Sequence, residues 1–305
     1  MTTTNSYKDT KAIDYLEAIK RNQLESRNSK SSSSNFDMTY MLPMTSDIGI
    51  ATTFTNTEKT LGDYDVVDNT GKLVAFLPFD YDVLDASNNN DGTITGTETY
   101  VDGPEISSTH PMRKAFSFNG STYITLANES NFDFEHTNAF SVSFWVKCGT
   151  ISATTGLVTK ANSNATAQIG WKCLLQNNGT VTFNLSDGTT TYGVTTTTDI
   201  DNNIWRFLCF TYSGNSNRSG MKIYIDGSLD NTGTSSTISS TILNNVTCVI
   251  GAFQASNYLT GSIDNVQIWN VELTSSDITD LYAGKQINRD TTATNPAILG
   301  LSDVT

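Results

Sequence analysis

The chain has 305 residues, of which 37% are hydrophobic and only 16% are charged, and its formal net charge is −13. Such a negative field opposes binding to nucleic-acid phosphates and to anionic lipid, so we expect neither as a partner. No run of about 18 apolar residues occurs, so we expect no membrane-spanning helix.

Residues 1–35 are predicted to form a short helix followed by a Ser-rich linker. Thr10 can cap a helix over TKAIDYLEAIKRNQLES. The apolar residues on or beside one stripe of this helix are Ile13, Tyr15, Leu16, Ile19 and Leu24. Such a helix is too short to be stable alone in water and must pack against the rest of the chain or a neighbouring subunit. Two interpretations stay open: a disordered N-terminus with a nascent helix, or an assembly arm of an oligomer.

Residues 36–71 mix apolar phrases such as FDMTYMLPM with the acidic, turn-like phrase LGDYDVVDNTG. We expect an irregular connector there. Residues 285–305 are predicted to be a polar C-terminal tail.

Residues 72–284 carry the pattern of an all-β domain. Phe140, Val142, Phe144 and Val146 alternate with Ser141, Ser143, Trp145 and Lys147, and WRFLCFTY and MKIYI show the same period of two. Tight hairpin turns are indicated at Asn119-Gly120, Asn178-Gly179, Asp187-Gly188 and Asp226-Gly227. This spacing predicts an antiparallel two-sheet sandwich or jelly roll.

One short helix is predicted near the end of this region. Thr274 or Ser275 can cap it, Asp277 lies in its first turn, and Gly284 can end it. Ile278, Leu281 and Tyr282 would form its apolar face.

The four cysteines are Cys148, Cys173, Cys209 and Cys248, and no two form a CxxC pair. A zinc site is therefore not expected. Each cysteine lies in or beside a β-like run, which favours buried free thiols.

Five phrases in order give a resemblance to a known family. They are LVAFLPFDYDVLDASNNNDGT, AFSFNGSTYITL, FSVSFWVK, WRFLCFTYSG with MKIYIDGSL, and IGAFQASNYLTGSIDNVQIWNVELTSSDITDLYAG. From Leu73 to Gly284 the chain resembles the laminin-G-like, concanavalin A-like lectin/glucanase superfamily. The resemblance implies a concanavalin A-like jelly roll that binds glycans, binds proteins or serves as a structural module.

The resemblance also implies a structural calcium ion that joins an early loop to the last strand. The early loop FDYDVLDASNNNDG offers Asp80, Asp85 and Asp91, and the last strand offers Asp264. Oxygen ligands of this kind suit Ca²⁺. The alternation of hydrophobic and polar residues shifts by one position between Ile263 and Val266, which predicts a β-bulge near Asp264. The alternative is an Asx-rich turn whose carboxylates bind its own backbone.

A lectin site needs an aromatic face and amide or carboxylate groups for sugar hydroxyls. The loop and loop-flanking residues that could supply them are Trp171, Tyr192, Asn215, Asn257 and Tyr258. No spacing among them singles out a sugar pocket, and each aromatic could equally be a core residue.

Catalysis is not expected. The glucanase branch of the resembled family uses a Glu-x-Asp-x-x-Glu pattern, and the nearest phrase here, Asp199-Ile200-Asp201, lacks the final acid. A glycosidase needs two facing carboxyl groups.

The functional hypothesis is a non-enzymatic module of a large assembly. Residues 1–35 lack the apolar stretch of a secretory signal, yet a lectin-like domain acts outside a cell. Release by lysis would resolve this mismatch, so the sequence favours a virion component, such as a capsid-decoration, head-fibre or tail-associated protein. Its partners would be other subunits, bound through the arm, and host-surface glycan. A cell-surface or secreted adhesin and a glycan-active hydrolase are the alternatives.

Overall fold

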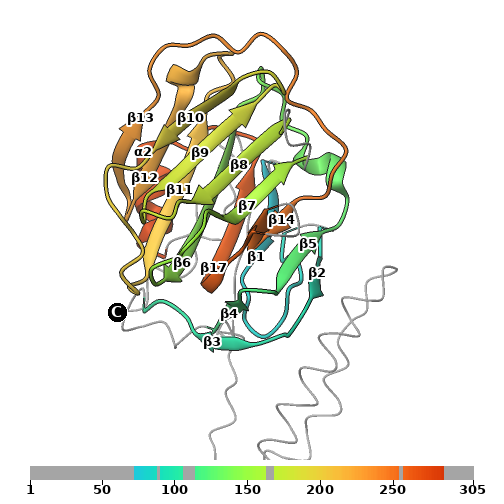
Figure 1. Cartoon of the computed structure of the whole chain (residues 1–305), viewed down its shortest axis with the longest axis vertical. Coiled ribbons are helices and arrows are strands. Elements are labelled where there is room, and N and C mark those ends of the chain that lie inside the picture. Colours follow the sequence, from blue (N-terminus) through green and yellow to red (C-terminus); the bar gives the residue numbers. More distant parts are fainter. Residues whose placement is uncertain (1–71, 88–89, 106–113, 163–167, 254–256, 285–305) are drawn as a thin grey trace, which may run out of the picture. The chain divides into compact units, whose positions relative to one another are not determined.

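The computed structural model describes residues 72–87, 90–105, 114–162, 168–253 and 257–284, which form a β-sandwich of two antiparallel sheets (Figure 1). The predicted all-β class and jelly-roll architecture are therefore confirmed. The predictions for residues 1–71 and 285–305 lie outside the described residues. They include the assembly-arm residues Ile13, Tyr15, Leu16, Ile19 and Leu24.

The first sheet has the strand order β13-β12-β11-β6-β17-β4-β3, and β1 also pairs with β17. Its strands are β1 (Leu73–Leu77), β3 (Tyr100–Asp102), β4 (Lys114–Asn119), β6 (Phe140–Cys148), β11 (Arg206–Tyr212), β12 (Met221–Ile225), β13 (Ser228–Thr232) and β17 (Thr260–Trp269). The predicted alternation in β6 and β11 is confirmed, because successive residues of both strands enter different apolar clusters.

The second sheet has the order β10-β9-β8-β7-β14-β5-β2, and β15 and β16 form a separate small hairpin. The bounds are β2 (Gly92–Thr95), β5 (Tyr123–Leu126), β7 (Thr155–Ala161), β8 (Gly170–Leu175), β9 (Val181–Ser186), β10 (Thr191–Thr195), β14 (Val249–Ile250), β15 (Ala252–Phe253) and β16 (Asn257–Tyr258). Two 3-10 helices, η2 (Glu129–Phe132) and η3 (Arg218–Gly220), lie in the connections.

Strand β17 changes its partner halfway along its length. It pairs with β6 on one side, while on the other side Thr260–Ile263 pair with β4 and Val266–Trp269 pair with β1. The register shifts between Asp264 and Gln267, and Asn265 has a φ of 51°. The bulge predicted near Asp264 is thus confirmed, and it lies where one neighbouring strand replaces the other.

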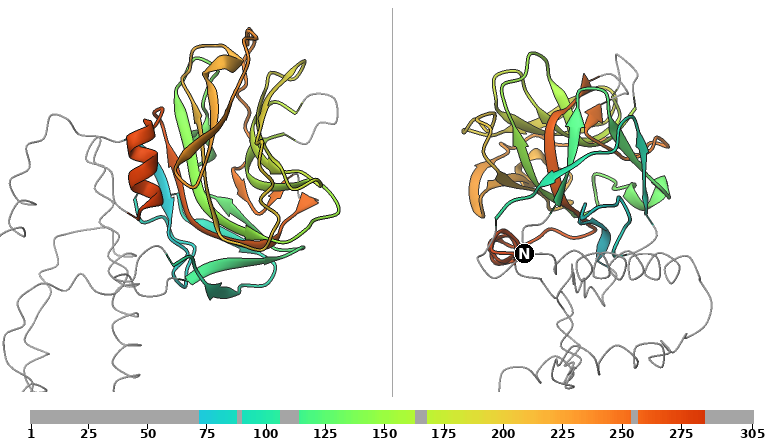
Figure 2. Two further views of the ribbon diagram at one scale, coloured as in Figure 1. Left: turned by 90° about the vertical axis from the view of Figure 1, so that its left-hand side faces the viewer. Right: turned by 90° about the horizontal axis from the view of Figure 1, so that it is seen from below.

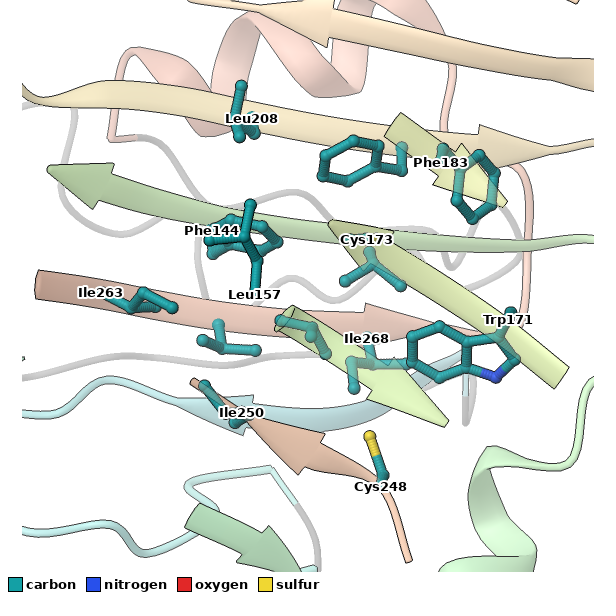
Figure 3. Close-up of a cluster of buried hydrophobic side chains, with 14 of the residues drawn as sticks. Phe144, Leu157, Trp171, Cys173, Phe183, Leu208, Cys248, Ile250, Ile263 and Ile268 are labelled. Atoms are coloured by element: carbon teal, nitrogen blue, oxygen red, sulfur yellow. The ribbon is translucent and has the colours of Figure 1, made fainter. Parts of the chain in front are cut away.

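The main core fills the space between the two sheets. Phe144 and Leu208 from the first sheet face Phe183 and Leu157 from the second, and Trp171 closes one side (Figure 3). All four cysteines are free and buried, as predicted. Burial raises the pKa of Cys148 and of Cys248 to about 12, so both thiols stay protonated at neutral pH.

The outer face of the first sheet is covered by helix α2 (Ser275–Tyr282), which Figure 2 shows beside the sandwich. Ile278 and Leu281 are buried in a second apolar cluster with Trp145 and Phe207. A capping box starts the helix: Asp277 N donates to Thr274 Oγ1 (3.3 Å), and Thr274 N donates to Asp277 Oδ2 (2.7 Å). The predicted helix is therefore confirmed. None of the helices in the described ranges is long and apolar enough to cross a membrane.

Candidate functional site

A polar depression, more open to solvent than enclosed, lies at one end of the sandwich, and we call it the end pocket. Its volume is about 340 Å³, within the range of small-molecule sites. Its lining residues are Val74, Asn131, Asp133, Phe134, Asn138, Ala139 and Asn270. Five of them come from the single segment 131–139, which joins β5 to β6, while Val74 and Asn270 come from β1 and the end of β17.

Buried aromatic residues fix the path of the segment 129–139. Phe134 stacks on Phe140 with ring centroids 4.7 Å apart and planes 11° from parallel. Phe132 is fully buried, and its carbonyl accepts a hydrogen bond from Trp171 Nε1 at 3.0 Å. Because the apolar side chains turn into the core, the intervening Asn131 and Asp133 are directed toward the pocket and its surroundings.

Asp133 is held in place by the buried ammonium group of Lys160. Its Oδ1 atom lies 2.7 Å from Lys160 Nζ, in an ion pair whose lysine side chain is 1% exposed and whose carboxylate is 29% exposed. The Oδ1 atom itself is buried. The other carboxylate oxygen is consequently the one that can face a ligand in the pocket.

Two further contacts position the floor of the pocket. Asn131 Nδ2 donates to Asn90 Oδ1 at 2.7 Å, and Asn90 Nδ2 donates to Val74 O at 2.6 Å. Asn90 is fully buried, so this chain of amides connects the loop after β1 to the pocket-lining segment.

The loop between β11 and β12, which we call the rim loop, packs on the same segment. Gly214 has a φ of 71°, and a Cβ there would lie 2.6 Å from Ala139 N, so glycine is required by both the dihedral angle and the close approach. Tyr212 Oη donates to His136 O at 2.6 Å. Burial raises the pKa of Tyr212 to about 12, so it remains a hydrogen-bond donor at neutral pH.

Glu135 joins the segment to the long connection after β13. It accepts hydrogen bonds from Ile242 N (3.0 Å), His136 N (2.7 Å) and Thr241 Oγ1. Burial alone would raise the pKa of Glu135, but these hydrogen bonds outweigh burial and lower it. The carboxylate is therefore ionised at neutral pH and acts as a structural acceptor.

The end pocket therefore combines carboxamide side chains with one positioned carboxylate. Carboxamides both donate and accept hydrogen bonds and a carboxylate accepts them, which are interactions that sugar hydroxyls can make. A site of this composition suits a neutral polyhydroxylated ligand better than an apolar one.

Two of the five sequence-predicted glycan residues are core residues. Trp171 is 1% exposed and Tyr192 is 7% exposed, and both belong to the main core. Register explains this, since Trp171 on β8 and Tyr192 on β10 both pair with Leu185 of β9 and so share its inward face. The predicted sugar contact at Trp171 is wrong, because no face of its ring is accessible. Tyr192 likewise offers little ring surface to a sugar.

The other three predicted residues lie at separate places on the surface. Asn215 is exposed on the rim loop next to Gly214. Asn257 and Tyr258 form β16, where the Tyr258 ring lies 5.9 Å from that of Tyr123. The structure does not bring these five residues together, and the sugar-binding role of the surface residues stays a prediction.

The acidic loop after β1 matches the Asx-turn alternative. Asp85 Oδ1 accepts from Phe76 N (2.9 Å), Ser87 N (2.9 Å) and Ser87 Oγ (2.8 Å), while Asp85 Oδ2 accepts from Asn90 N (3.0 Å). Asp91 Oδ1 accepts from Asp85 N, and Asp80 Oδ1 accepts from Lys114 N. These contacts are those of an Asx-rich turn whose carboxylates bind its own backbone and that of neighbouring strands.

Asp264 is fully buried at the bulge, where its Oδ1 accepts from Asn265 N at 2.9 Å. Within the ranges described, no three His, Cys, Asp or Glu side chains gather in a way that could hold a metal ion. Calcium binding at Asp80, Asp85, Asp91 and Asp264 stays a prediction.

The pocket residues were not predicted from the sequence, although the phrase NESNFDFEHTN contains four of them. Its spacing of buried Phe132 and Phe134 between Asn131, Asp133 and Glu135 is a period-two signal that directs polar side chains to one side. Asn270 and Lys160 had no such local signal, because only the tertiary fold brings them to this end.

A two-layer sandwich with a polar pocket at the ends of its strands defines a lectin-like fold. The chain belongs to the concanavalin A-like lectin/glucanases superfamily, whose laminin G family model matches residues 118–279, more than half of the sequence. No curated protein sequence matches the chain significantly.

Solved structures with the same fold include two toxin binding domains and one domain of an arabinanase. The binding domain of Paraclostridial Mosquitocidal Protein 1 is 20% identical, with a TM-score of 0.56 over 69% of this chain and 52% of that domain. The binding domain of botulinum neurotoxin DC, in complex with rat synaptotagmin II, is 18% identical, with a TM-score of 0.55 over 70% of this chain and 51% of that domain. The chain thus spans about half the length of these toxin domains.

The third is domain 4 of AbnA, a GH43 extracellular arabinanase from Geobacillus stearothermophilus, solved in complex with arabinotriose. It is 26% identical, with a TM-score of 0.51 over 69% of this chain and 98% of that domain. This match covers nearly the whole of that domain.

Proposed function

We propose that the sandwich is a non-catalytic glycan-binding module and that the end pocket is its sugar site. The observation that carries this proposal is the positioned Asp133 carboxylate among the amides of Asn131, Asn138 and Asn270. Three carboxamides and a carboxylate offer donors and acceptors to a hydroxyl-rich ligand, and their rigid attachment lowers the entropy lost on binding.

The likeness to the arabinanase module supports this class of ligand. That module was solved with arabinotriose, and the likeness covers 98% of its length. A short arabino-oligosaccharide is therefore the first probe to test, followed by a broad glycan array.

The decisive experiment is calorimetric titration of the full chain with arabinotriose and with any glycan that the array identifies. Asn270→Ala removes an exposed pocket amide and should weaken binding roughly tenfold. Asn202→Ala is the matched control, because its neighbour Asn203 N donates to Cys148 O, at the far end of β6 from the pocket. The control should bind as the wild-type chain does.

Two outcomes would count against the proposal. If no glycan on the array binds, glycans are excluded as the ligands of this protein. Equal loss in Asn270→Ala and Asn202→Ala would show that binding occurs elsewhere, and Asn215→Ala and Tyr258→Ala would then locate it.

The assembly context is a further part of the proposal. In it, residues 1–35 attach the module to other subunits of a virion, with the sandwich facing outward toward host glycan. Its support is the apolar stripe predicted from the sequence between Ile13 and Leu24. Light scattering should show an oligomer for the wild-type chain and a smaller species for Leu16→Asp/Ile19→Asp. A wild-type monomer that still binds glycan would favour the adhesin alternative instead.

A further inference from the structure

Lys160 is a lysine enclosed in oxygen atoms at the base of the end pocket. It lies on β7 opposite Trp171 of β8, on the inward face of the second sheet. The distances from its Nζ atom are 2.7 Å to Asp133 Oδ1, 3.0 Å to Glu129 Oε2, 3.0 Å to Asn244 O, 3.4 Å to Asn244 Oδ1 and 3.0 Å to Val246 O.

The chemistry of this oxygen cage is that of a hard-cation site. Two carboxylates, two backbone carbonyls and one amide oxygen are the ligand types that calcium ions take in proteins. The observed distances, however, fit N–H···O hydrogen bonds and exceed calcium–oxygen distances of about 2.4 Å. The ammonium group is therefore the cation of this site.

The cage connects three segments that are far apart in the sequence. Glu129 and Asp133 belong to the pocket-lining segment, Asn244 and Val246 to the long connection before β14, and Lys160 to a central strand. Asn244 Nδ2 also donates to Lys160 O (3.2 Å) and Ile169 O (3.1 Å), so the connection is fixed where β7 ends and β8 begins. Removing the ammonium would leave two carboxylates and two carbonyls facing each other without a positive charge.

We propose that Lys160 is a positioning residue for the end pocket and that its ammonium replaces a structural calcium ion. It neutralises Glu129 and Asp133, orients the ligand-facing oxygen of Asp133, and joins the segment 129–133 to the 244–246 loop. The part concerning Asp133 rests on the proposed glycan site, while the cation replacement does not.

The cage predicts that a calcium ion can take the place of the ammonium group when Lys160 is shortened. Lys160→Ala removes the ammonium and frees volume beside the oxygens, so the variant should lose thermal stability in EDTA and recover part of it in millimolar CaCl₂. Lys160→Met lacks the charge but still fills the space, so calcium should not restore it. The wild-type chain and Lys172→Met, which alters the other buried lysine, should show no calcium-dependent rise through this site.

Thermal unfolding without any sugar gives the first readout. A calcium-dependent rise in Tm for Lys160→Ala, above any rise in the wild-type chain, supports the cage. A folded Lys160→Ala chain with no such rise overturns it. If Lys160→Ala is unfolded in both buffers, a double-mutant cycle of Lys160→Gln and Asp133→Asn takes its place. Non-additive losses of Tm support the pairing of Lys160 with Asp133, and additive losses overturn it.

Glycan titration gives the second readout. Lys160→Met should bind the glycan identified for the wild-type chain at least tenfold more weakly, the size expected when a charged hydrogen-bond partner is removed. If calcium restores the Tm of Lys160→Ala but the wild-type chain binds no glycan, the proposed function is wrong. The replacement of calcium by the Lys160 ammonium is then still supported. Unchanged glycan affinity in Lys160→Met would instead remove the positioning role while the pocket remained the sugar site.

Discussion

Trp145 on β6 and Tyr282 on α2 stack with ring centroids 5.6 Å apart and ring planes 26° from parallel. This contact joins the centre of the first sheet to the last turn of the helix, outside the main core. The sandwich therefore has a second apolar layer, which depends on a single short helix.

The helix should contribute substantially to stability. Ile278 is fully buried in the second cluster, so Ile278→Ala should lower the free energy of unfolding by about 2–4 kcal/mol. Ser276→Ala, an exposed position of the same helix, is the control and should change little. Urea unfolding monitored by tryptophan fluorescence measures both. Equal stabilities of the two variants would mean that α2 does not pack as described.

The loop after β1 allows a direct test of calcium. Asp85→Ala removes the acceptor of four hydrogen bonds and should lower stability by about 3 kcal/mol or more, equally in CaCl₂ and in EDTA. Asp264→Ala tests the ion predicted from the sequence, because with a bound ion the loss of Tm should occur only when calcium is available. An equal loss after chelation would argue against an ion at Asp264.

The four cysteines should be unreactive in the native protein. Burial raises the pKa of Cys148 and Cys248 to about 12 and raises those of Cys173 and Cys209 as well, so little thiolate exists at pH 8. A thiol-specific disulfide reagent should label none of them without denaturant and all four in concentrated urea. Rapid labelling of the native chain would show that the core opens far more often than the packing implies.

The fold was predictable because its signals are local. The period of two in β6 and β11, the Asp226-Gly227 turn with φ values of 49° and 79°, and the Thr274 capping box are each read from a few neighbouring residues. The bulge near Asp264 was predictable for the same reason, since a slipped alternation is visible within one strand.

The end pocket was not predictable because strand pairing creates it. Asn270 is 132 positions or more from the other polar lining residues and meets them through the pairing of β17 with β6. The burial of Lys160 and Lys172 could not be predicted from the sequence either. Lys160 pairs with Trp171 on the inner face, whereas Lys172 pairs with Thr159 on the opposite face, and nothing local in the sequence distinguishes them. The same reasoning explains the misassignment of Trp171, whose face depends on register.

Lys172 leads to the last prediction, which concerns pH. Its side chain is buried, its Nζ donates to Gln168 Oε1 at 2.6 Å, and it lies 5.2 Å from the centroid of the Phe253 ring. Burial lowers the pKa of Lys172 from 10.5 to about 8. The folded state therefore disfavours the charged lysine, and between pH 8 and pH 10.5 the unfolded chain binds more protons than the folded one.

The sign of the effect follows from that difference. Stability from this group is fully present above pH 10.5, falls as the pH drops toward 8, and stays reduced below. Lys172→Met has no proton to gain, so at pH 7 it should be more stable than the wild-type chain by up to about 3 kcal/mol. The lost contacts with Gln168 and Phe253 would reduce this gain. The stability advantage of Lys172→Met should shrink as the pH rises from 8 to 10.5. Over that range the lysine is neutral in the folded wild-type chain, and the free-energy cost of losing its proton on folding falls. Denaturant unfolding of both chains at pH 7, 8.5 and 10 measures this trend, and a constant difference across the three would show that Lys172 keeps an ordinary pKa in the folded protein.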